Sequence, residues 1–158
     1  MTSKYLDMLE DSLRNKKDIL EKLTELSNRQ KDIVKEAAVD WEQFDLLVDE
    51  KGALIDRLEN LDNGFEAVYN RIREDVSTNK DKYKDSLINI QKLISAVTEA
   101  STRLMALERR NKTAIEASFN NERTNISQVK KTSEVAANYY KSMSRVNFID
   151  PQLMDRKK

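Results

Sequence analysis

The sequence of 158 residues contains no cysteine and no histidine. Without cysteine there can be no disulfide and no thiol nucleophile. Without histidine the chain lacks the commonest transition-metal ligand and the side chain that most readily exchanges a proton near neutral pH. These two absences exclude most catalytic and metal-binding arrangements, so we expect neither enzymatic activity nor a cofactor.

Glycine and proline are also scarce, with two residues and one residue respectively. A β-sheet protein needs both in its turns, whereas the residues that dominate here, Ala, Leu, Glu, Lys and Arg among them, favour helix. No stretch approaches the roughly 20 apolar residues of a membrane span, and the opening "MTSKYLDMLEDS" has no apolar core of signal-peptide length. We therefore expect one all-α domain in the cytoplasm.

The chain also has no excess of either positive or negative charge. The chain has 28 basic and 28 acidic residues and no block of five or more like charges. Nucleic acids and anionic membranes attract concentrated positive charge. The sequence as a whole therefore predicts neither a nucleic-acid partner nor a membrane partner.

Three heptad repeats run along the chain. Apolar residues alternate at spacings of three and four over residues 6–37, 44–72 and 83–115, which is the pattern of helices that pack along a seam. Asp40 followed by Gln43 is a capping-box pattern at the start of the second repeat. Because short connections make neighbouring helices antiparallel, we predict a coiled-coil-like three-helix bundle of long antiparallel helices.

The third repeat changes phase near its end. Phe119 follows Ile115 at a spacing of four where the heptad calls for three, a stutter that alters the supercoil. Beyond it the stripe is thinner, and residues 115–158 carry a net charge of +3, with eight basic and five acidic residues. We expect the third helix to extend, or to break near 115–125 and give a C-terminal helix. The predicted domain covers 1–145, with helices at about 3–38, 41–76, 79–120 and 121–145, and 146–158 as a flexible tail.

Polar residues interrupt the apolar seams at a few levels. If the first two helices reverse near residue 39, Lys16 lies opposite Asp62. A second reversal near 77–78 brings Lys51 within about one turn of Glu108. Single polar residues at core positions usually fix helix register at some cost in stability, and we predict that role for both pairs.

The C-terminal stripe has two interpretations. It is either core that packs against the base of the bundle or a surface for a partner, because the first two helices already cover about 38 residues of the third. Tyrosine gives large contacts at low entropic cost and methionine adapts to irregular partners, so an exposed set suits capture of an amphipathic helix from another protein. The candidate partner-binding residues are Ile126, Val129, Ala136, Tyr139, Tyr140 and Met143, with Met154 in the tail.

Several segments resemble the FlgN family of flagellar type III export chaperones. They are "FDLLVDEKGALIDRLENLD" at 44–62, "LMALERRNKTAI" at 104–115, "ANYYKSM" at 137–143, and the ending "IDPQLMDRKK". The resemblance implies a cytoplasmic, non-enzymatic protein that binds the C-terminal helical ends of hook-associated (hook–filament junction) proteins, prevents their premature association and delivers them to the export apparatus. It implies no nucleotide or metal. The cargo contacts of the family lie in the C-terminal part, which corresponds here to residues 126–143.

Two other functions compete with this one. The first is a coiled-coil scaffold or homodimeric adaptor in which the C-terminal stripe pairs with itself. The second is a cofactor-bearing four-helix enzyme, although the usual di-metal site of such bundles needs a Glu-x-x-His motif that this sequence lacks. We expect a monomer or a weak homodimer, with components of the export apparatus as further candidate partners.

Overall fold

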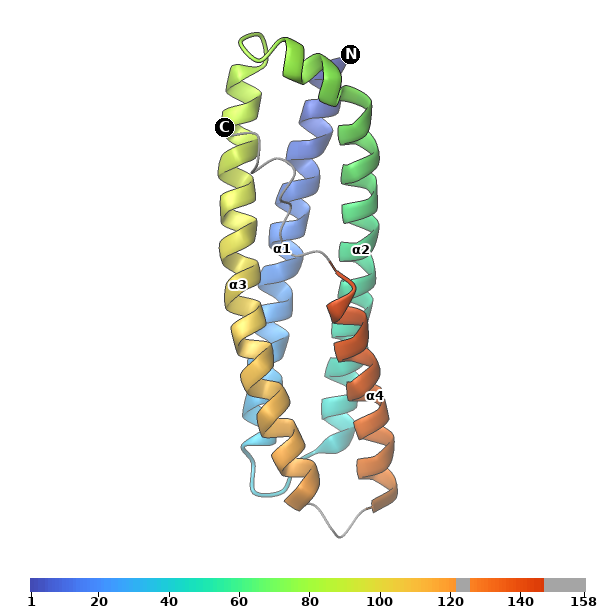
Figure 1. Cartoon of the computed structure of the whole chain (residues 1–158). Helices are drawn as coiled ribbons and strands as arrows, with labels where there is room; N and C mark the ends of the chain where they lie inside the picture. Colours follow the sequence, from blue (N-terminus) through green and yellow to red (C-terminus); the bar gives the residue numbers. More distant parts are fainter. Residues whose placement is uncertain (122–125, 147–158) are drawn as a thin grey trace.

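A computed structural model of the chain describes residues 1–121 and 126–146, and of residues 126 and 127 it describes the backbone alone. The described residues form four helices and no strand (Figure 1). The predicted all-α class is therefore confirmed. The helices are α1 (Thr2–Val34), α2 (Trp41–Thr78), α3 (Lys84–Asn121) and α4 (Ile126–Ser144).

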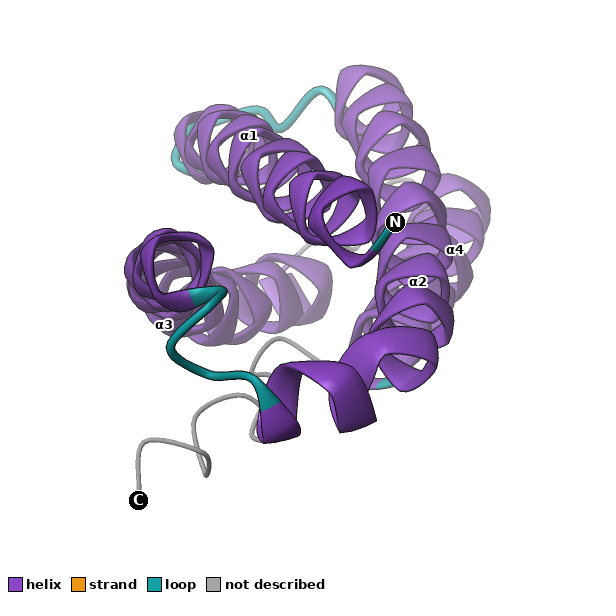
Figure 2. Cartoon of the chain, turned by 90° about the horizontal axis from the view of Figure 1, so that it is seen from above, coloured by secondary structure: helices purple, strands orange, loops and turns teal. Residues whose placement is uncertain are grey.

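The long helices α1, α2 and α3 run the length of the molecule, and α4 covers about half of it (Figure 1). Helices α1 and α3 run in one direction, and α2 and α4 run in the other. Helix α1 packs along both α2 and α3, which lie on either side of it when the bundle is seen end-on (Figure 2). Helix α4 packs mainly on α2, beside the half of α2 that follows the first turn. One half of the bundle therefore has three helices and the other has four.

The predicted boundaries need three corrections. The first helix ends at Val34, four residues earlier than expected, because residues 35–40 form the connection to α2. The third helix begins at Lys84 and not at 79, because the preceding residues form turns. It ends at Asn121, and α4 begins at Ile126, so the alternative with a break after the stutter is the one observed. Of the predicted tail, residues 147–158 lie outside the described part.

Local sequence explains where α2 begins. The Asp40 carboxylate accepts a hydrogen bond from the backbone N–H of Gln43 at 3.1 Å, as the capping pattern predicts. Trp41 follows directly, with its ring centroid 5.4 Å from that of Phe44 and 5.0 Å from that of Phe119. Phe119 is the residue at which the heptad of α3 changes phase. The stutter therefore sets an aromatic contact between the end of α3 and the start of α2.

At the opposite end of the bundle, Asp75 near the end of α2 joins neighbouring segments through hydrogen bonds. Its carboxylate accepts hydrogen bonds from the hydroxyls of Thr2 at 2.6 Å and Tyr83 at 2.8 Å, and from the side-chain amide of Asn79 at 2.7 Å. These bonds hold the pKa of Asp75 below its usual value, the Thr2 bond contributing most. The start of α1 is thus tied to the turn between α2 and α3.

The heptad positions form the core. Many leucine and isoleucine side chains of the three long helices are almost completely buried, and burying each one contributes about 1.5–3 kcal/mol relative to leaving it in water. The most deeply buried apolar residues are Leu6, Leu9, Leu20, Leu23, Leu26, Phe44, Ile55, Leu58, Ile90 and Leu104. This core holds α1 between α2 and α3. Helix α4 adds buried side chains to the core at one end of the bundle.

Candidate partner-binding site

A network of buried polar side chains joins the three long helices beneath α4. Lys51 of α2 is completely buried, and its Nζ donates to Oε1 of Glu108 on α3 at 2.8 Å and to Oε1 of Gln30 on α1 at 2.6 Å. The Ser27 hydroxyl donates to the same Glu108 oxygen. The Asn111 side-chain amide donates to the Ser27 carbonyl at 2.8 Å. The predicted contact between Lys51 and Glu108 is confirmed, and it belongs to a larger network.

Burial of this network has an energetic cost. Desolvation lowers the pKa of Lys51, while the negative charge and hydrogen bond of Glu108 oppose the shift. A buried charge that loses its partner destabilises a protein strongly, because its desolvation is no longer compensated. The network therefore favours the one helix register that brings Gln30, Lys51 and Glu108 together.

The second predicted pair also forms. Nζ of Lys16 on α1 lies 2.7 Å from Oδ1 of Asp62 on α2, with the two side chains 7% and 23% exposed. This pair lies in the three-helix half of the bundle. It is distant in sequence from the Lys51 network and lies at a different level along the bundle axis. The two pairs thus join α1 to α2 and α2 to α3 at separate levels.

Helix α4 is attached to α2 through two contacts of different chemistry. The ring of Tyr139 covers Lys51, whose Nζ lies 4.4 Å from the ring centroid. Nearer the start of α4, Thr132 Oγ1 and Gln128 Nε2 both donate to Oδ2 of Asp45 at 3.1 Å. Desolvation raises the pKa of Asp45, and its hydrogen bonds with α4 partly offset that rise. The C-terminal helix is therefore specifically docked on α2.

This docking corrects the expectation of an exposed C-terminal stripe. Ala136, Tyr139 and Met143 are only 4%, 5% and 9% exposed, because α4 folds back along α2 and turns these residues inward. For these three residues the core interpretation is the observed one. Val129 and Tyr140 are half-buried at the edge of the core. The side chain of Ile126 and all of Met154 lie outside the described residues.

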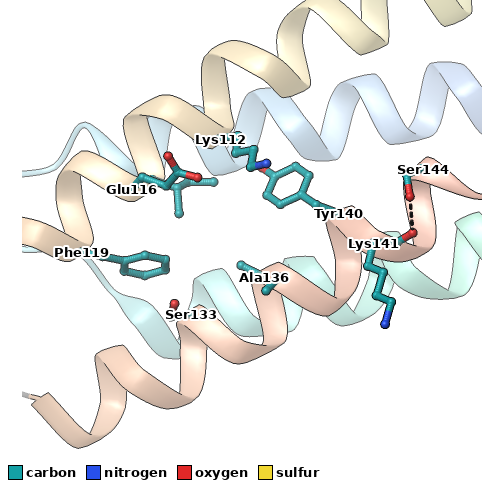
Figure 3. A pocket seen from close by; sticks show the side chains of 10 residues that line it. Lys112, Glu116, Phe119, Ser133, Ala136, Tyr140, Lys141 and Ser144 are labelled. Atoms are coloured by element: carbon teal, nitrogen blue, oxygen red, sulfur yellow. Dashed lines mark hydrogen bonds between the residues drawn. The ribbon is translucent and has the colours of Figure 1, made fainter.

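The side of α4 that faces α3 borders a groove (Figure 3). We call it the α3–α4 groove. It consists of a hollow of about 520 Å³ and an adjoining hollow of about 280 Å³, which share Lys112, Tyr140 and Ser144. Its apolar lining comes from both helices and comprises Met105, Ile115, Phe119, Ala136, Ala137, Tyr140, Met143 and Val146. Its length from Met105 to Phe119 along α3 is about 21 Å at 1.5 Å per residue.

Tyr140 lies at the centre of the groove. Its ring extends from α4 toward α3, where Lys112 approaches it with Nζ 5.7 Å from the ring centroid (Figure 3). The ring is in edge contact with Tyr139, at 5.2 Å between centroids and 70° between planes. Burial, followed by the negative charges of Glu108 and Glu116, raises the pKa of Tyr140 far above its usual value. The phenol is therefore neutral at physiological pH.

The two adjacent tyrosines thus have different surroundings. Tyr139 lies over the buried Lys51 and joins α4 to α2, whereas Tyr140 lines the groove and reaches toward α3. Burial is also the main reason that the pKa of Tyr139 is raised, with the Glu108 carboxylate beside it as a further cause. Sequence reasoning identified both tyrosines but not this division. It missed Ala137, Lys112 and Phe119 as groove residues, because their positions depend on how α4 folds back.

Within residues 1–121 and 126–146, no three or more carboxylates are grouped closely enough to hold a metal ion. In the same part of the chain, none of the helices has the length and apolar character needed to cross a membrane. Comparisons of the chain with protein-family models, curated proteins and solved structures found no match.

Proposed function

We propose that this protein is a cytoplasmic export chaperone of the FlgN type, which binds the C-terminal helices of hook-associated flagellar proteins and delivers them to the type III export apparatus. The observation that carries the proposal is the α3–α4 groove, a hollow with a largely apolar lining that extends about 21 Å along α3 in the C-terminal half of the chain. The segments that resemble the family border this groove at 104–115 and 137–143. Both lines of argument point to the same surface.

The groove suits the capture of a helix for a physical reason. Helix α4 packs on α2 but leaves its other side bordering an open channel against α3. An amphipathic helix binds such a channel by laying its apolar stripe into it. Tyr140 and Met105, which are both half-buried, supply large and adaptable contacts to such a stripe. Cargo ends that lack their assembly partners expose apolar stripes of this kind, and covering them prevents aggregation.

Co-purification with the C-terminal segment of a hook-associated protein tests the proposal. Ala137 is exposed and lines the groove, so Ala137→Glu puts a charge into the apolar lining without changing the core. Its neighbour Asn138 is exposed and does not line the groove, so Asn138→Glu adds the same charge elsewhere. We expect wild type and Asn138→Glu to bind alike, and Ala137→Glu to bind at least about tenfold more weakly, which corresponds to about 1.4 kcal/mol.

A harsher variant places a charge at the centre of the groove. Tyr140→Asp should also reduce binding, and circular dichroism and thermal melting will establish whether this variant remains folded. Absence of any complex at concentrations of tens of micromolar, with the wild type folded, would contradict the chaperone proposal. A dimer that depends on concentration and is lost in Ala137→Glu would favour the homodimeric scaffold instead.

A further inference from the structure

The two helices that form the α3–α4 groove carry more exposed basic than acidic residues there, although the whole chain has equal numbers of acidic and basic residues. Two segments border the groove, residues 105–119 of α3 and residues 128–146, which include α4 from Gln128 onward. Their exposed charged side chains are seven basic and two acidic. The remaining carboxylate of these segments, Glu108, is buried and paired with Lys51. The two helices that form the groove therefore carry an excess of exposed basic side chains, which the overall composition conceals.

The same bias holds for the residues that border the groove. Arg109, Lys112 and Lys141 are exposed at its edges, against one exposed carboxylate, Glu116. Lys112 is directed across the groove toward Tyr140, whereas the ammonium group of Lys141 points away from it (Figure 3). None of these four side chains takes part in an ion pair among the described residues. Arg109 and Lys112, at the edge formed by α3, are thus available to a ligand that carries negative charge beside its apolar surface.

We infer that the groove selects a helix of about four turns whose apolar stripe is flanked by acidic residues. The length follows from the roughly 21 Å between the levels of Met105 and Phe119, which about 14 helical residues span. The acidic flanks follow from the charges at the edges, because complementary potentials favour binding and speed association. The inference rests on the proposed function in taking the occupant to be a helix of a partner protein, and it adds the chemistry by which that helix is chosen.

The shape of the site favours a helix over an anionic membrane. A bilayer presents a flat surface to basic residues, whereas the apolar residues here line a channel between two helices. Tyr140 and Ala136 contribute to the wall of this channel and do not project from the molecule. Such a recessed lining is suited to a ligand that is itself cylindrical and apolar along one side.

Binding of two synthetic peptides to the full chain tests this inference. Both are helical, about 16 residues long, with one leucine stripe at i, i+3, i+4 and i+7 spacing, and they differ only in having glutamate or lysine beside the stripe. By fluorescence anisotropy at about 50 mM salt, where charges are weakly screened, we expect the glutamate peptide to bind at least about tenfold more tightly. Its affinity should fall as the salt is raised to about 300 mM.

Charge-reversal variants identify the residues that cause the preference for the glutamate peptide. The double variant Arg109→Glu with Lys112→Glu should abolish the preference for the glutamate peptide. Lys92→Glu is the control, because Lys92 is an exposed lysine of the same helix about 30 Å from Lys112 at 1.5 Å per residue. Retention of the preference in the double variant, or an equal loss in the control, would overturn the inference.

The remaining outcomes separate this inference from the proposed function. Equal affinity for the two peptides, with the hook-associated segment still bound, would overturn charge selection and leave the chaperone function standing. Failure of the hook-associated segment to bind, with the glutamate peptide still preferred, would overturn the flagellar function and support the groove chemistry. Binding to vesicles that contain about one-third phosphatidylserine, with neither peptide bound, would identify a membrane surface and overturn the inference. Dimerisation that blocks both peptides would identify a second copy as the occupant and also overturn it.

Discussion

Replacing Lys51 by methionine is expected to lower the free energy of unfolding by about 3–5 kcal/mol, the usual cost of removing one partner from a buried ion pair. Lys51 Nζ is the donor to both Glu108 and Gln30, and all three side chains are at most 3% exposed. Its loss leaves a buried carboxylate without its cation and a buried amide oxygen without its donor. Urea unfolding monitored by circular dichroism measures the change.

A double-mutant cycle distinguishes the ion pair from simple loss of packing. We expect Glu108→Leu to be destabilising alone, and the combination with Lys51→Met to be less destabilising than the sum by about 1–3 kcal/mol, since contacting groups are coupled. Lys92→Met is the control for replacing an exposed lysine and should change stability by less than about 0.5 kcal/mol. Additive effects of the two buried substitutions would mean that Lys51 and Glu108 do not act as a pair.

The second large effect is expected at Tyr139, where truncation to alanine should release α4 from α2. The side chain is 5% exposed and covers Lys51, and removing a buried aromatic ring costs about 3–5 kcal/mol. Because α4 has its main packing against α2 alone, the loss should be local. Native-state hydrogen exchange should show amide protection falling in α4 by roughly a hundredfold or more, as about 3 kcal/mol implies, with α1 and α3 little changed.

Tyr139→Phe provides the matched control. It keeps the ring over Lys51 and removes only the hydroxyl, so α4 should retain most of its protection. Uniform loss of protection in all four helices of Tyr139→Ala would contradict the view that α4 docks as a separate unit. Unchanged protection in α4 would contradict the role of Tyr139 in that docking.

The all-α fold class and the register of the long helices could be predicted from the sequence, because the heptad spacing indicates both. The positions of Lys16 and Asp62, and of Lys51 and Glu108, follow from counting residues outward from two turns, and both contacts form. The start of α2 was readable from the Asp40 cap. These features depend on residues close in sequence or on the fixed rise per residue of a helix. A single sequence is therefore enough to predict them.

The path of α4 could not be predicted in the same way. The stutter at Phe119 indicates a local change of supercoil, but not whether the following helix extends from the bundle or folds back along α2. Folding back depends on contacts between distant residues, such as Asp45 with Thr132 and Lys51 with Tyr139. The inward burial of Tyr139 and the groove beside Ala137 are consequences of that path. They therefore appear only in three dimensions.

Site-specific photocross-linking determines whether the α3–α4 groove is the surface that binds a helix of a partner protein. A photoreactive amino acid replaces Ala137 in the groove, Asn138 beside it, or Lys92 on the distant part of α3, and each variant is irradiated with the C-terminal segment of a hook-associated protein. We expect strong capture from position 137 and little from 138 or 92, because only residue 137 lines the groove. Equal capture from all three positions, or capture from position 92 alone, would contradict it.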